Sequence, residues 1–171
     1  VYFSGHTLPI GFRHEDYAAL KTASQVFGAG SLSSRLGERL REKEGLSYGV
    51  RASYSAFNEE ENSRFTIMAI ANPTNTPKVV QLVDEELNRL VKEGVTAKEL
   101  AAAQQSYVQG FSLQFNDDGR LAGLIADMIL QGDSVLFYDD LFNRVKGVTL
   151  EQINAAIKKH LIPKKLIVVT A

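Results

Sequence analysis

Two strand-like segments joined by a short polar turn constrain the fold more than any other feature. Residues 46–57 alternate between apolar and polar side chains, and residues 64–71 are apolar on both faces. A period of two indicates a strand with one buried face, and an apolar run indicates a central strand. The intervening residues 58–62 are enough for only a tight reversal, so we expect an antiparallel pair.

Apolar residues recur at helical spacing in the segments around this pair. Thr96 with Glu99, and Thr149 with Gln152, have the spacing of capping boxes. Further strands are predicted at residues 6–10 and 166–170. Because most helices follow the middle strands, the pattern predicts an α+β fold: a mainly antiparallel sheet of about four strands with helices on one face. We expect one domain over residues 1–171. The predicted helices cover residues 16–27, 32–44, 77–93, 97–115, 121–130, 136–145 and 150–161.

Composition excludes several classes of function. The formal net charge is −1 and the basic residues are scattered, so nothing predicts a nucleic-acid or anionic-lipid partner. No apolar run approaches the ~18 residues of a membrane span. The chain has no cysteine, which excludes disulfides, thiolate zinc sites and a cysteine nucleophile.

The histidines do not have the spacing of a metal site. His6, His14 and His160 include no pair four residues apart, the spacing that places two imidazoles on one helical face. The side chains of residues 14–16 diverge around a helix, so we interpret them as a solvated helix start. His160 falls in a last helical turn, where a cation favours the helix dipole. We therefore predict no metal and no cofactor in this chain.

The segment 33–50 carries the most specific candidate site. Its sequence is SSRLGERLREKEGLSYGV, in which Arg41 ends a basic helix, Gly45 reverses the chain and Tyr48 opens the strand. A guanidinium and a phenol brought together by this turn would supply hydrogen-bond donors to a peptide carbonyl and to a developing oxyanion. Spacing leaves an alternative open. Tyr48 shares the predicted buried face of its strand, and Arg41 would then only complement the helix dipole.

The same segment resembles the non-catalytic half of the pitrilysin/insulinase metallopeptidases, and also the subunits of the mitochondrial processing peptidase. The family pattern is Ser-Arg-Leu, then Leu-Arg-Glu, then Gly-Leu-x-Tyr, which here corresponds to residues 34–36, 40–42 and 45–48. The tail, with residues 148–153 and 159–163, matches in style. The inverted zinc motif His-x-x-Glu-His of the catalytic half is missing from this sequence.

The resemblance implies a fragment: the C-terminal, zinc-free half of a longer zinc metallopeptidase. Such a half would face a homologous zinc-bearing domain, in cis or in trans, across a chamber that holds the peptide substrate. Arg41 and Tyr48 would bind that substrate and assist the transition state. The rival hypothesis is a scaffold or interaction module of the same fold with no peptidase role. The family also suggests a bacterial protein, with the periplasm as its expected compartment.

Overall fold

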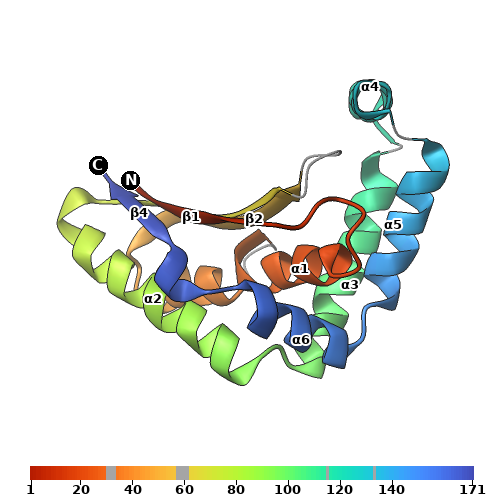
Figure 1. Ribbon diagram of the computed structural model, residues 1–171. Helices are drawn as coiled ribbons and strands as arrows, with labels where there is room; N and C mark the ends of the chain where they lie inside the picture. Colours follow the sequence, from red (N-terminus) through yellow and green to blue (C-terminus); the bar gives the residue numbers. More distant parts are fainter. Residues whose placement is uncertain (30–33, 57–61, 115, 133) are drawn as a thin grey trace.

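The computed structural model of the protein describes residues 1–29, 34–56, 62–114, 116–132 and 134–171. Within them, four strands form one antiparallel sheet in the spatial order β2-β3-β1-β4 (Figure 1). The strands are β1 (Tyr2–Leu8), β2 (Ser47–Ala56), β3 (Ser63–Ala71) and β4 (Ile167–Thr170). The predicted antiparallel pair is therefore confirmed, and β3 is central because it lies between β2 and β1.

The first strand differs from its prediction. It begins at Tyr2, four residues before the expected start at His6. Ser4 and Gly5 hide it in the sequence, because both are poor strand formers. In the structure Ser4 is fully buried and its hydroxyl accepts a hydrogen bond of 2.8 Å from the Tyr2 phenol. Burial with a hydrogen-bond partner makes this polar residue compatible with the inner face.

Helices cover one face of the sheet, and the opposite face is open (Figure 1). Figure 1 shows α1, α2, α3 and α6 below the sheet. Both termini lie side by side at the ends of β1 and β4, where the Ala171 amide donates to the Val1 carbonyl oxygen over 3.0 Å. The α-helices are α1 (Tyr17–Ser24), α2 (Thr76–Glu93), α3 (Ala97–Gln114), α4 (Asp118–Gln131), α5 (Val135–Gly147) and α6 (Leu150–His160). Two π-helical segments, η1 (Gln25–Ala29) and η2 (Gly37–Lys43), and two 3-10 turns, η3 (Pro73–Asn75) and η4 (Pro163–Lys165), complete the described elements.

The core lies between the sheet and these helices. Phe27, Tyr54 and Phe65 are among its largest fully buried side chains. The sequence predicts that the first helix ends at residue 27, but it continues through η1 to Ala29, and residue 30 lies outside the described residues. A Cβ at Gly28 would lie 2.6 Å from the amide nitrogen of Ala52. Gly28 is thus required for the close approach of η1 to β2.

The predicted capping boxes are confirmed. The Thr96 amide donates to Glu99 Oε2 over 2.8 Å, and the Glu99 amide donates to Thr96 Oγ1 over 3.3 Å. Thr149 and Gln152 make the same reciprocal pair at 2.9 and 3.2 Å. Helix α2 begins at Thr76, one residue before the predicted start at residue 77, and η3 precedes it.

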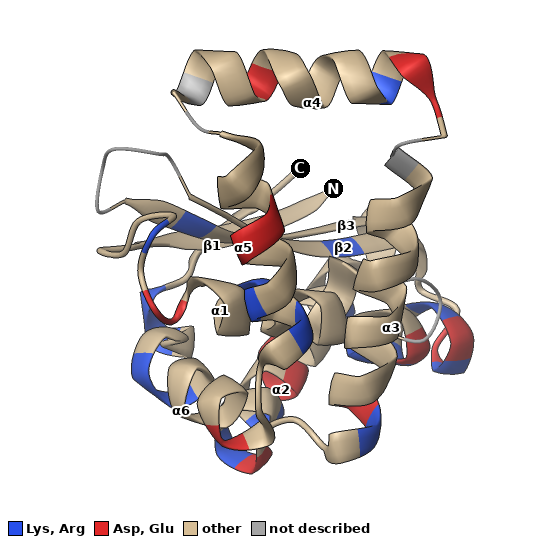
Figure 2. Cartoon of the chain, turned by 90° about the vertical axis from the view of Figure 1, so that its right-hand side faces the viewer, with Lys and Arg blue, Asp and Glu red and all other residues tan. Residues whose placement is uncertain are grey.

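Helix α4 stands apart from the body of the molecule (Figure 2). It starts at Asp118, earlier than the expected Leu121, because the Asp117 carboxylate caps it by accepting from the Arg120 amide over 2.8 Å. Ile129 and Leu130 are among its exposed apolar residues. Within the described ranges no single helix is both long and apolar enough to cross a membrane. Only α4 and α5 together pass that test, as a pair bent by 106°.

Candidate functional site

The turn between η2 and β2 is built on two buried leucines. Leu36 and Leu40 are fully buried and anchor the helical segment to the core. Gly45 has φ of 62°, a left-handed conformation that favours glycine, and it ends the helix. The Leu46 amide then donates to the Leu40 carbonyl oxygen over 2.8 Å, so the chain reverses into the strand within a few residues.

Tyr48 is exposed on this turn. Its side chain is 89% exposed, although the period-two pattern places it on the buried face. A β-bulge causes the difference: Ser47 pairs with Ala71 and Gly49 with Ile70, so Tyr48 is the extra residue. The alternative that Tyr48 is a core residue is therefore wrong. Tyr54 occupies that role, with its hydroxyl donating to Ser63 Oγ over 2.9 Å.

The Ser47 side chain stabilises the bulge. Its hydroxyl lies 2.9 Å from the carbonyl oxygens of both Gly49 and Ile70 and donates to them from inside the strand pair. Ser47 is buried, so a polar side chain replaces the apolar one that regular alternation predicts at this level of the sheet. The β-bulge thus accounts for both the burial of Ser47 and the exposure of Tyr48.

Arg41 is also exposed, one turn before Gly45. Among the residues the structure describes, its guanidinium makes no ion pair or hydrogen bond, while its carbonyl oxygen accepts from the Gly45 amide over 3.2 Å. Arg41 and Tyr48 thus flank one reversal with both side chains open to solvent. Their joint action on a peptide remains a prediction.

The neighbouring arginine of the motif has a structural role that the sequence analysis missed. Arg35 Nε and Nη2 donate to the two Glu99 carboxylate oxygens over 2.6 and 2.9 Å, and Nη2 also donates to the Gly94 carbonyl oxygen over 2.7 Å. Burial opposes ionisation of Glu99, but hydrogen bonds from Arg35 and Thr96 outweigh it and lower the pKa of Glu99 to about 2. Arg35 therefore ties the start of η2 to the α2–α3 connection.

Arg39 lies in a second ionic cluster between η2 and α2. Its guanidinium is 3.2 Å from Glu44, 3.6 Å from Glu85 and 3.9 Å from the buried Glu86. Arg89 also contacts Glu86 at 3.0 Å. These contacts fix the orientation of η2, and with it the positions of Arg41 and Gly45.

His160 lies in the last turn of its helix, as predicted. The predicted divergence of residues 14–16 around a helix is wrong for His14 and Asp16, because both precede α1 and His14 Nδ1 lies 3.9 Å from the Asp16 carboxylate. His160 ends α6, and its Nε2 is 2.8 Å from the Asp16 carboxylate, which Lys159 also contacts at 2.9 Å. Burial opposes ionisation of Asp16, and these two partners lower its pKa. His14 Nδ1 accepts from the Asp16 amide over 3.0 Å. Within the described ranges no group of three His, Cys, Asp or Glu side chains is placed to hold a metal ion.

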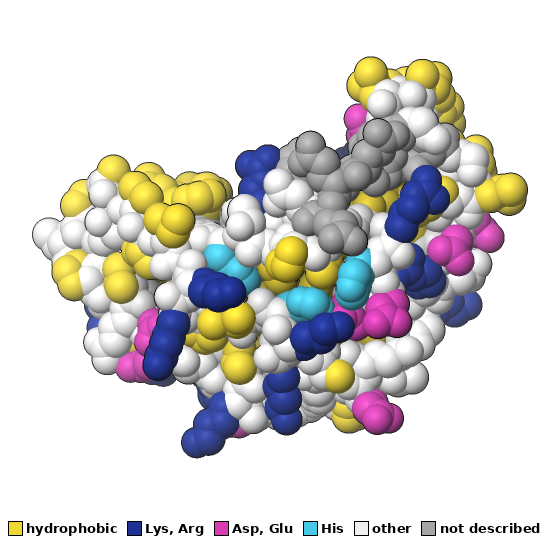
Figure 3. Space-filling view, in the orientation of Figure 1, with side chains coloured by type: hydrophobic (Ala, Val, Ile, Leu, Met, Phe, Trp, Pro, Cys, Tyr) yellow, Lys and Arg dark blue, Asp and Glu magenta, His cyan; other side chains and the backbone are white. Residues whose placement is uncertain are grey.

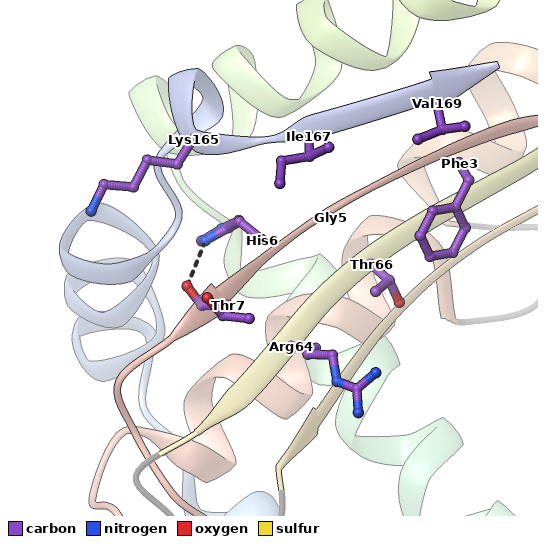
Figure 4. A pocket seen from close by; sticks show the side chains of 9 residues that line it. All are labelled: Phe3, Gly5, His6, Thr7, Arg64, Thr66, Lys165, Ile167 and Val169. Atoms are coloured by element: carbon purple, nitrogen blue, oxygen red, sulfur yellow. Dashed lines mark hydrogen bonds between the residues drawn. The ribbon is translucent and has the colours of Figure 1, made fainter.

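A hollow of about 570 Å³ lies on the open face of the sheet (Figure 4). Its apolar wall consists of Phe3, Ile167 and Val169, and Arg64 and Lys165 are among its polar lining residues. Figure 3 shows hydrophobic side chains gathered above the ends of β1 and β4, with basic side chains and histidines below them. The sequence alone did not predict this feature, because its lining comes from β1, β3, η4 and β4, which are far apart along the chain.

Comparison with known proteins identifies the family of the chain. The family model of the peptidase M16 inactive domain matches residues 1–107. An uncharacterized zinc protease of Streptomyces coelicolor is 28% identical over 132 residues, which are 77% of this chain and 28% of that protein. The non-peptidase homolog YmxG of Helicobacter pylori is 28% identical over 161 residues, 94% of this chain and 36% of that protein. The chain thus spans about a third of the length of these curated relatives.

Solved structures share the fold. The peptidase M16 inactive domain from Pseudomonas fluorescens superposes with a TM-score of 0.81 at 25% identity, over 98% of this chain and 39% of that one. The periplasmic protease PqqL from Escherichia coli gives 0.71 at 19% identity, over 98% of this chain and 18% of that one. With the family model matching well over half of its residues, the chain belongs to the peptidase M16 inactive-domain family, which confirms the pitrilysin/insulinase resemblance.

Proposed function

We propose that this domain is the substrate-binding, zinc-free half of a zinc-dependent endopeptidase. It holds a peptide opposite a homologous zinc-bearing domain. The Arg41 guanidinium and the Tyr48 phenol donate hydrogen bonds to the peptide carbonyl and to the oxyanion that forms from it. The observation that carries the proposal is the bulge at Ser47, which exposes a tyrosine that regular strand geometry would bury.

Zinc belongs to the partner domain in this proposal. The described residues of this chain include no group of three metal ligands, and its sequence has no His-x-x-Glu-His motif. When bound in the partner, zinc supplies an activated water for attack on the peptide bond. The contribution of this chain is to orient the carbonyl and to supply hydrogen-bond donors from Arg41 and Tyr48.

The test is reconstitution with the zinc-bearing domain of the same protein or of its partner subunit. Tyr48→Phe removes one donor and should lower kcat about 10²-fold, the usual effect of losing an oxyanion donor. Arg41→Ala should mainly raise KM, because it weakens peptide binding. Lys43→Ala, an exposed cation in the same helical segment, and Tyr107→Phe are matched controls that should leave turnover unchanged. Full turnover in both the Arg41 and the Tyr48 variants would refute the catalytic role.

The second candidate is a scaffold or interaction module. Two observations favour it: the relative named a non-peptidase homolog, and the exposed apolar residues of α4, which suit contact with another protein. If the domain is a scaffold, the purified complete assembly should bind no zinc and hydrolyse no peptide. Stoichiometric zinc and peptide hydrolysis by that assembly would exclude it.

We also propose a bacterial periplasmic location. Its support is the similarity to the Escherichia coli protein described as periplasmic. Fractionation of the native cells, with a periplasmic and a cytoplasmic marker enzyme as references, tests it. Recovery of the protein with the cytoplasmic marker would refute it.

A further inference from the structure

The hollow on the open sheet face has the chemistry of a binding site. Its lining residues come from three strands and from the 3-10 turn η4 (Figure 4). The lining side chains Phe3, Ile167 and Val169 are 46%, 73% and 58% exposed. Apolar side chains that remain in water around a concave surface lose hydration when an apolar group covers them, and this favours binding.

Gly5 creates the depth of the hollow. In the sheet it lies opposite Thr66 on β3 and opposite Ile167 on β4. A Cβ at this position would be 2.8 Å from the Phe65 carbonyl oxygen and 3.1 Å from Thr66 Cγ2. Strand β1 therefore has no side chain at Gly5. The floor of the hollow at this point is the backbone of β1, flanked by Thr66 and Ile167.

Charge is distributed unevenly around the hollow. Two of its described lining residues, Arg64 and Lys165, are cations, and none is a carboxylate. His6 contributes a polar wall; burial lowers its pKa, and the contact of its Nδ1 with the Thr7 carbonyl oxygen at 3.2 Å opposes that shift. An occupant that is apolar on one side and anionic on the other complements this surface.

The hollow lies along the sheet from Tyr48. Gly49, next to Tyr48, pairs with Ile70, four residues along β3 from Thr66, which pairs with Gly5 in the hollow. At about 3.3 Å per residue this is roughly 13 Å along the strands, and β1 lies two strand spacings, about 10 Å, across the sheet from β2. The separation is therefore roughly 16 Å, a distance that about five residues of extended peptide span.

We propose that this hollow binds the carboxyl-terminal residue of a peptide, with its apolar side chain over Gly5 and its carboxylate against Lys165. The assignment deepens the proposed peptide-binding function and rests on it. The last residue of a peptide carries its side chain and its terminal carboxylate on the same Cα. This suits the hollow, in which the apolar Ile167 is only two residues from Lys165. The expected ligands are peptides that end in a leucine-like residue.

The inference is tested by titrating the ¹⁵N-labelled chain with a synthetic peptide, acetyl-Ala-Ser-Ala-Ser-Ala-Leu, and following the amide resonances. The free acid should shift the signals of Gly5, Thr66 and Ile167. The carboxamide of the same peptide should bind about fivefold more weakly, the effect of one ion pair near the surface. A third peptide, amidated but with aspartate before the leucine, distinguishes a terminal carboxylate from an acidic side chain.

Variants locate the carboxylate contact. Lys165→Ala should remove the preference for the free acid, whereas Lys164→Ala, a neighbouring exposed lysine outside the hollow, should retain it. Ile167→Asp should weaken binding of the free-acid peptide, because it places a negative charge beside the peptide carboxylate. Ile129→Asp on the distant α4 should leave this binding unchanged. Equal binding of acid and amide, equal binding of the aspartate peptide, or no shifts at the hollow would each overturn the inference. The effect of Tyr48→Phe on turnover tests the proposed function separately.

Discussion

The ion pair between Arg35 and Glu99 should make the domain sensitive to acid. Replacing Glu99 by Gln keeps the shape of the side chain and removes its charge. The pKa of Glu99 falls from an ordinary value of 4.5 to about 2 in the folded chain. Each pKa unit corresponds to about 1.4 kcal/mol, so the full difference is about 3 kcal/mol. The side chain is 29% exposed, and solvent screening reduces its contribution to about 2 kcal/mol.

The sign of the pH dependence follows from linkage. A carboxyl group whose pKa is lower in the folded state stabilises the fold above its unfolded pKa, and this contribution disappears as the pH falls through the folded pKa. Glu99→Gln should therefore lower the free energy of unfolding by about 2 kcal/mol at pH 7. Its melting temperature should fall by about 4–8 °C. The difference from the parent chain should shrink between pH 5 and pH 2.

Urea unfolding followed by circular dichroism at pH 7, 5, 4 and 3 measures this difference. Glu42→Gln is the matched control, since Glu42 is an exposed glutamate of η2 with no ion pair among the described residues. It should unfold like the parent at every pH. A Glu99→Gln variant as stable as the parent at pH 7, or equally destabilised at pH 7 and pH 3, would refute the reasoning.

Two further predictions concern the backbone. Gly28→Ala should lower the free energy of unfolding by about 1–3 kcal/mol, because its Cβ would meet the backbone of β2 in a packed core; a melting temperature equal to that of the parent would contradict this. Ser47→Ala removes the hydroxyl that bridges the bulge and should cost about 1 kcal/mol. It should also broaden the Tyr48 ring resonances, whereas Ser53→Ala on the same strand should not. Unchanged Tyr48 resonances would show that the bulge forms without Ser47.

Local signals predicted much of the fold. Hydrophobic period and capping spacing identified β2, β3 and the long helices, because each such signal is contained within one element. The bulge at Ser47 was not predictable from alternation, since the pattern continues unbroken across it. The contact of Arg35 with Glu99 joins residues that are 64 positions apart, and nothing in either local sequence specifies it. The first helix extends to Ala29 rather than 27, and the second ends at Lys43 rather than 44, where π-helical turns depart from the 3.6-residue period. The predicted start of the second helix at residue 32 lies outside the described residues.

The three arginines of the motif differ in the partners that they have in the structure. Arg35 is held by Glu99 and Gly94, and Arg39 by Glu44, Glu85 and Glu86. If the only role of Arg41 were to interact with the helix dipole, Lys43 could fill that role equally well, because Lys43 lies closer to the end of the same helix. Instead Arg41 has carboxylates near it in sequence and pairs with none of those that the structure describes. The exposed Arg41 guanidinium therefore retains its donors for an external acceptor, and the proposed function assigns this acceptor to a peptide carbonyl.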